Sequence, residues 1–158
     1  MPILARTMFG LVNWAARKGL AESTAAPART VAAGQKARRT GVRGETYAYW
    51  YLRRNGYVMI ARNFSYRGVR GEIDLVGYDG ATLAFVEVKT RTSPRENFGS
   101  PEDAVTPDKQ RRLSRMARQF IREYRARSAP FRFDILAIEA LPGQRPIVRL
   151  HKGAFAAQ

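Results

Sequence analysis

Two strand-like segments joined by a tight turn constrain the fold of this chain more than any other feature. Residues 72–78 and 82–91 are apolar runs interrupted by charge, and the Asp79-Gly80 pair between them is typical of a hairpin turn. Such a turn pairs the two segments antiparallel and brings Asp74 near Glu87 if the register follows the turn. The sequence therefore predicts two neighbouring carboxylates on one sheet.

The charges on these segments gather on one face. Because residues two apart on a strand project to the same side, Glu87 and Lys89 point together, whereas Val86 and Val88 pack on the other side. Burial of carboxylates on an apolar strand is unfavourable unless a cation compensates them. With Asp74, the pattern predicts a divalent-metal site suited to phosphodiester chemistry.

Each residue around this site has an expected role. Asp74 and Glu87 supply the carboxylates that Mg²⁺ or Mn²⁺ takes as ligands, and the main-chain carbonyl of Val88 adds a third oxygen where the strand bends. Lys89 stabilises the attacking hydroxide or the developing charge on the phosphate. Glu45, on a preceding helix, is expected to bind a second ion or to orient water; the alternative is a glutamate that only stabilises the helix dipole.

The remaining periodicity predicts an α/β fold. Helices are expected over 45–55 and from Pro107 to about Arg127, the second with Thr106 as its N-cap. Strands are expected over 57–64, 72–78, 82–91, 131–139 and 147–150. This order of elements favours a mixed β-sheet flanked by helices.

An excess of basic residues indicates a polyanionic partner. The chain contains 28 Lys and Arg against 13 Asp and Glu, a formal net charge of +15. Nucleic acid is favoured over an anionic membrane surface, and a merely soluble basic protein is the alternative. Residues expected to contact the nucleic-acid backbone are Arg91, Lys109, Gln110 and Arg112, the last three on the second helix, where an exposed polar face is the alternative.

Absent residue types exclude several mechanisms. There is no cysteine, which excludes disulfides, thiolate metal sites and a cysteine nucleophile and is compatible with a reducing cytoplasm. The one histidine, His151, is expected to be structural or exposed. No run approaches the roughly 18 apolar residues of a membrane-spanning helix, so we expect a soluble, cytoplasmic protein.

The N-terminal segment and two further acids have mostly structural interpretations. Residues 1–41 predict a short amphipathic helix or loose tail followed by a linker or basic arm, and residues 42–158 predict one domain. Glu72 shares a face with Asp74; the alternatives are a further metal ligand, an outer partner of the metal and a strand-end salt bridge with Arg70 or Arg91, and the outer or structural role is favoured. Asp134 is as readily a buried partner of a neighbouring arginine as a ligand.

Several short stretches together carry a family resemblance. They are Gly44-Glu45, Gly56-Tyr57, Arg62-Asn63-Phe64, Gly71-Glu72-Ile73-Asp74-Leu75, Phe85-Val86-Glu87-Val88-Lys89-Thr90-Arg91, Phe98-Gly99 and Lys109-Gln110-Arg111-Arg112-Leu113. Over about residues 42–150 the chain resembles the YraN family of uncharacterised bacterial proteins. That family is similar to the PD-(D/E)xK nuclease superfamily, with its restriction-endonuclease-like fold, and particularly to archaeal Holliday-junction resolvases.

This resemblance implies metal-binding and catalytic roles for Glu45, Asp74, Glu87 and Lys89. Ile73 stands where the superfamily motif has proline, a departure that resolvase-like members tolerate. The leading hypothesis is a metal-dependent endonuclease acting on DNA rather than RNA, on branched or otherwise structured substrates, for which the resolvase resemblance implies a homodimer. The alternatives are a non-catalytic nucleic-acid-binding module that keeps the fold, and a structural protein whose acids pair with its arginines.

Overall fold

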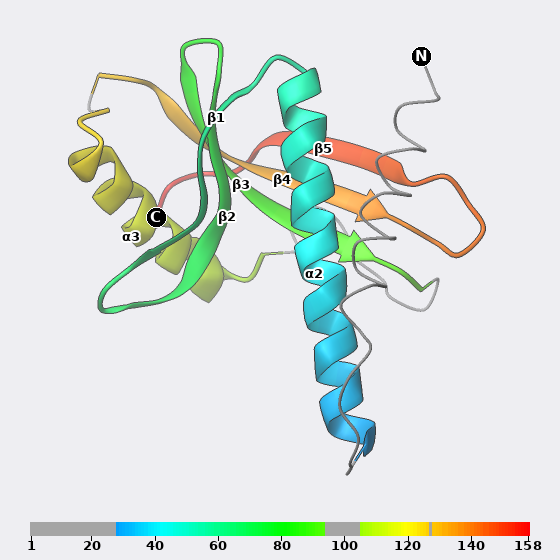
Figure 1. Ribbon diagram of the computed structural model, residues 1–158. Coiled ribbons are helices and arrows are strands. Elements are labelled where there is room, and N and C mark those ends of the chain that lie inside the picture. The colour runs from blue at the N-terminus through cyan, green and yellow to red at the C-terminus, as the bar shows by residue number, and fades with distance from the viewer. Residues whose placement is uncertain (1–27, 94–104, 127) are drawn as a thin grey trace. The chain divides into compact units, whose positions relative to one another are not determined.

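The computed structural model describes residues 28–93, 105–126 and 128–158 (Figure 1). Its elements are α2 (Ala28–Arg54), β1 (Val58–Tyr66), β2 (Val69–Asp79), β3 (Thr82–Arg91), α3 (Pro107–Glu123), β4 (Phe131–Glu139) and β5 (Ile147–Phe155). The chain divides into two units, residues 1–43 and 44–158, and the sheet, α3 and the candidate site lie in the second. The predictions for residues 1–27 and for Phe98-Gly99 fall outside the described residues.

The strands form one five-stranded mixed sheet in the order β1-β2-β3-β4-β5. Strands β1, β2 and β3 are an antiparallel meander, β4 lies parallel to β3, and β5 is antiparallel to β4. Parallel neighbours need a crossover connection, and α3 provides it because it lies between β3 and β4 in the chain. The predicted α/β fold with a mixed sheet is confirmed.

Two apolar clusters lie on opposite faces of the sheet. One includes Phe85 of β3, and α3 contributes Leu113, Met116, Ala117 and Phe120 to it. The other includes Val86, and α2 contributes Ala48 and Leu52 to it. Because Phe85 and Val86 are consecutive strand residues, their side chains point to opposite faces. Each face of the sheet is therefore covered by one helix.

Two helix boundaries differ from the prediction. α2 begins at Ala28, so residues 28–41 are helical, whereas their composition predicts a linker. The reason is that this segment is rich in alanine and arginine and contains a glutamine, and all three residue types are good helix formers. α3 ends at Glu123 because Arg125 has a left-handed φ of 53° and Ala126 donates its N–H to the Ile121 carbonyl at 3.0 Å. Neither described helix is long and apolar enough to cross a bilayer.

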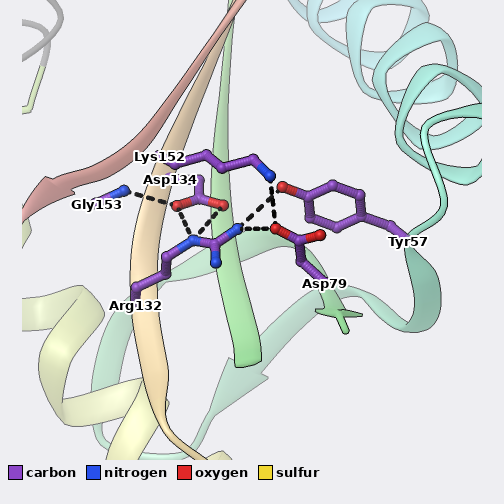
Figure 2. Close-up of polar contacts among 6 residues, drawn as sticks. All are labelled: Tyr57, Asp79, Arg132, Asp134, Lys152 and Gly153. Carbon is purple, nitrogen blue, oxygen red and sulfur yellow. Dashed lines mark hydrogen bonds and ion pairs between the residues drawn. The ribbon is translucent and has the colours of Figure 1, made fainter. Parts of the chain in front are cut away.

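A polar network fixes the end of the sheet near the β2–β3 turn (Figure 2). It consists of Tyr57, Asp79, Arg132, Asp134, Lys152 and Gly153. Asp134 is fully buried and accepts hydrogen bonds from Arg132 Nε at 2.8 Å and from the Gly153 N–H at 2.9 Å. Arg132 also donates to Asp79 Oδ2 at 2.6 Å. The predicted pairing of Asp134 with a neighbouring arginine is confirmed.

Close packing of α2 on β3 predicts the effect of a single methyl group. A Cβ atom at Gly44 would lie 1.8 Å from Thr90 Oγ1, so Gly44→Ala should lower the free energy of unfolding by about 1–3 kcal/mol, the usual penalty of overpacking. The matched control is Gly41→Ala in the same helix, where no atom lies within 4 Å and alanine should raise the free energy by up to about 1 kcal/mol. Urea unfolding of both variants measures the difference, and equal effects would contradict the contact.

Candidate metal and nucleic-acid site

Asp74 and Glu87 occupy adjacent positions on neighbouring strands. The antiparallel register pairs Leu75 with Val86, and Asp74 and Glu87 are the next residues along each strand. Glu87 lies two residues after Phe85 and shares its face, which α3 covers. The hairpin therefore brings the two carboxylates together, as the sequence pattern predicts.

Asp74 is held by a backbone hydrogen bond in a poorly solvated position. Its Oδ2 atom accepts the Val88 N–H at 2.7 Å. Burial raises the pKa of Asp74 to about 7, and the neighbouring Glu87 charge acts in the same direction. The Val88 hydrogen bond and the ammonium of Lys109 lower this pKa, but they do not offset burial. A second positive charge at this position would be strongly stabilising.

Glu87 has one compensated oxygen and one free oxygen. Its side chain is buried, and Oε1 receives both Lys89 Nζ, at 3.0 Å, and Lys109 Nζ in a close ion pair. Oε2 is also buried, and it has no hydrogen-bond partner among the described residues. A buried carboxylate oxygen without a partner is rare in folded proteins, and a bound cation is one way to satisfy it.

The donor set fits a hard divalent cation. Because the N–H and C=O groups of a strand residue point to the same edge, the Val88 carbonyl faces β2 together with the N–H that Asp74 accepts. Two carboxylates and one carbonyl, completed by water, match the oxygen ligands of Mg²⁺. Within the described ranges no group of three or more His, Cys, Asp or Glu side chains is placed to hold a metal, so the site depends on Asp74 and Glu87.

Glu45 lies at the margin of this site rather than in it. Its Oε2 atom accepts a hydrogen bond from Asn63 Nδ2 at 2.9 Å, and its charge contributes slightly to the raised pKa of Asp74. Asn63 has a left-handed φ of 49° in β1, a conformation that asparagine tolerates better than most residues. The sequence gives Asn63 no predicted role beyond its place in the Arg62-Asn63-Phe64 stretch, although an asparagine inside a strand is itself unusual.

Two of the residues expected to bind nucleic acid are engaged elsewhere. Arg91 forms an ion pair with Glu139 of the adjacent strand β4. Gln110 donates its side-chain amide to the Val105 carbonyl at 3.0 Å, which ties α3 to the segment before it. These contacts give both side chains structural roles.

A cavity of about 320 Å³ adjoins Asp74 between β2 and α3. Its charged lining residues are Arg70, Glu72, Asp74, Lys109 and Arg112. Lys109 and Arg112 thus line the same cavity as Asp74, and their contact with a phosphate backbone stays a prediction. Glu72 forms no ion pair with any described residue, so the expected strand-end salt bridge is absent. Arg70 was not identified from the sequence because its proximity to α3 depends on tertiary packing.

The raised pKa of Asp74 predicts a pH-dependent stability. Between its ordinary value of 3.8 and about 7, the unfolded state is ionised whereas the folded state retains the proton, so stability falls as pH rises through this window. Asp74→Asn removes this penalty and can still accept the Val88 N–H. Without divalent cations, the variant should melt several degrees above wild type at pH 8 and close to it at pH 4.

Thermal unfolding followed by circular dichroism in EDTA measures this effect. The matched control is Glu72→Gln, which neutralises an exposed acid two residues away on the same strand and should show no such pH dependence. Equal shifts of Asp74→Asn at both pH values would contradict the burial of an ionisable Asp74.

Comparison with known proteins identifies one matching family model and several similar relatives. Residues 44–138 match the model of the uncharacterised protein family UPF0102. A UPF0102 protein of Symbiobacterium thermophilum is 45% identical over 120 residues, covering 76% of this chain and 98% of the relative. A UPF0102 protein of Koribacter versatilis is 40% identical over 117 residues, covering 74% of this chain and 79% of the relative. A UPF0102 protein of Geobacter metallireducens is 44% identical over 115 residues, covering 73% of this chain and 90% of the relative. The resemblance to the YraN family is thereby confirmed, and the chain belongs to protein family UPF0102.

Proposed function

We propose that this protein is a Mg²⁺- or Mn²⁺-dependent endonuclease that hydrolyses phosphodiester bonds in DNA. The observation that carries the proposal is the Asp74–Glu87 pair, in which a buried Glu87 oxygen has no partner among the described residues. A structural pair of acids would be expected to be fully hydrogen-bonded. The net charge of +15 supports a polyanionic substrate.

The residues around this pair have complementary roles in the proposed reaction. A divalent cation bound by Asp74, Glu87 and the Val88 carbonyl would neutralise charge on the scissile phosphate and lower the pKa of a bound water. Lys89, which lies 3.0 Å from Glu87 Oε1, is positioned to stabilise negative charge that develops beside that carboxylate. Glu45, fixed by its hydrogen bond to Asn63, is positioned to orient water at the margin of the site.

A non-catalytic nucleic-acid-binding module is the second candidate. It is favoured by the ion pair between Lys109 and Glu87, because an ammonium group already compensates part of the charge that a metal would neutralise. Such a module would use the same basic cavity to bind DNA without cleaving it. The two candidates therefore differ in whether a divalent cation displaces Lys109.

Metal-dependent cleavage tests the leading proposal directly. Wild type should cleave at least one of four labelled DNAs (junction, flap, single strand or duplex) in Mg²⁺ or Mn²⁺ but not in EDTA. Asp74→Ala and Glu87→Ala should each lower the cleavage rate by at least about a hundredfold, since each removes a charged group from the reacting centre. The control Asp108→Ala removes an exposed acid from α3 and should retain activity. Full activity of the Asp74 and Glu87 variants would refute the site, whereas salt-dependent binding without any product would favour the second candidate.

Competition at Glu87 predicts that Lys109→Gln binds metal more tightly than wild type. Loss of a partly exposed ion pair worth up to about 1 kcal/mol should strengthen Mn²⁺ binding by about fivefold in a calorimetric titration. Arg111→Gln is the matched control because it removes the same charge from the same helix, where Arg111 pairs only with Asp108 among the described residues. Weaker Mn²⁺ binding by the Lys109 variant, or an equal change in both variants, would show that Lys109 and metal do not compete.

A further inference from the structure

The cavity beside Asp74 has a size and position that metal chemistry alone does not explain. Its volume of about 320 Å³ is at the lower end of the roughly 300–1,000 Å³ typical of small-molecule sites. It therefore suits one small ligand rather than a protein segment or a DNA duplex. Because Asp74 forms part of its wall, a ligand in the cavity would lie directly beside the proposed reacting phosphate.

Two arginines give the cavity unpaired donors. Arg70 reaches it from the start of β2 and Arg112 from α3, and neither makes an ion pair or hydrogen bond with another described residue. A guanidinium group presents its N–H donors in a planar fork that matches the oxygens of a phosphate. Lys109 also lines the cavity, but its ammonium is paired with Glu87, so the guanidinium groups of Arg70 and Arg112 are the donors left for an anionic ligand.

The wall contributed by α3 also has an apolar part. Leu113 and Met116 line the cavity with the small fraction of their side chains that is not buried in the core. Nucleobases removed from a duplex are commonly held against apolar or aromatic side chains, and the thioether of methionine makes favourable contacts with aromatic rings. A ligand that combines a phosphate with a flat aromatic group satisfies both parts of the lining.

We propose that the cavity binds one unpaired nucleotide of the DNA, next to the phosphate held at Asp74, with Arg70 and Arg112 on its phosphate and Leu113 and Met116 against its base. This inference rests on the proposed nuclease function and assigns its substrate class. A base within an intact duplex must be unstacked and unpaired before it can enter, which costs a few kcal/mol. The protein therefore selects DNA in which pairing is already interrupted.

Fluorescence anisotropy in EDTA tests this selection without cleavage. The probes are a labelled, fully paired duplex, the same duplex with one unpaired nucleotide, and the single strand. Wild type should bind the two DNAs with unpaired nucleotides at least about tenfold more tightly than the paired duplex, because these two DNAs do not need to break a base pair before a nucleotide enters the cavity. Arg70→Gln and Arg112→Gln should each reduce this preference.

Matched controls come from the same two elements. Arg67→Gln changes a residue of the β1–β2 turn near Arg70, and Arg115→Gln changes a residue one turn after Arg112 on α3. The side chains of Arg67 and Arg115 are exposed, and neither lines the cavity. Each control should weaken binding of all three DNAs uniformly, because loss of a general phosphate contact does not depend on base pairing.

The possible outcomes separate this inference from the proposed function. Failure of wild type to bind any of the DNAs in EDTA would overturn the cavity assignment, and the metal-dependent cleavage assay then decides the nuclease proposal separately. Equal binding of all three DNAs, or control variants that reduce the preference as much as Arg70→Gln and Arg112→Gln, would overturn the cavity assignment and leave the nuclease proposal intact. Displacement of DNA by a free mononucleotide, without any preference among the DNAs, would assign the cavity to a free nucleotide and would also overturn the inference.

Discussion

The hydrogen bond from the Val88 N–H to Asp74 Oδ2 is the interaction on which the site depends. The backbone pairing between β2 and β3 extends as far as Leu75 and Val86. Just beyond it, the Val88 N–H donates to the side chain of Asp74 instead of to the backbone of β2. This exchange fixes Asp74 beside Glu87. Beyond Val86, the donors and acceptors of β3 that face β2 are not consumed by a continued ladder.

Two buried carboxylates in this protein differ in how completely the fold compensates their charge. Asp134 receives a guanidinium and a backbone N–H, so its buried charge is fully compensated within the fold (Figure 2). Glu87 receives two ammonium groups on one oxygen, and its other oxygen has no partner among the described residues. Asp74 next to it is poorly solvated and has a raised pKa. Stability alone would not favour such an arrangement, whereas binding of a divalent cation would complete it.

The sequence predicts those parts of the site that depend on local geometry. Alternation along two strands and the Asp79-Gly80 turn are enough to bring Asp74 and Glu87 together, because strand period and hairpin register are both local properties. The ion pair between Lys109 and Glu87 joins residues 22 positions apart and depends on where α3 packs, which the apolar periodicity of the helix does not determine. For the same reason, Arg70 could not be assigned to the cavity. The end of α3 was missed because Arg125, not glycine, adopts the left-handed conformation.

The crossover helix α3 couples the two halves of the proposed site. It covers the sheet face that carries Glu87, and its first turns place Lys109 on Glu87 and Arg112 at the cavity. In the proposed function a divalent cation would replace the ammonium at Glu87, and Lys109, which already lines that wall, would then be available on the cavity side. Metal binding would then increase the positive charge offered to an incoming phosphate. By linkage, a DNA that binds this cavity should in turn strengthen metal binding at Glu87.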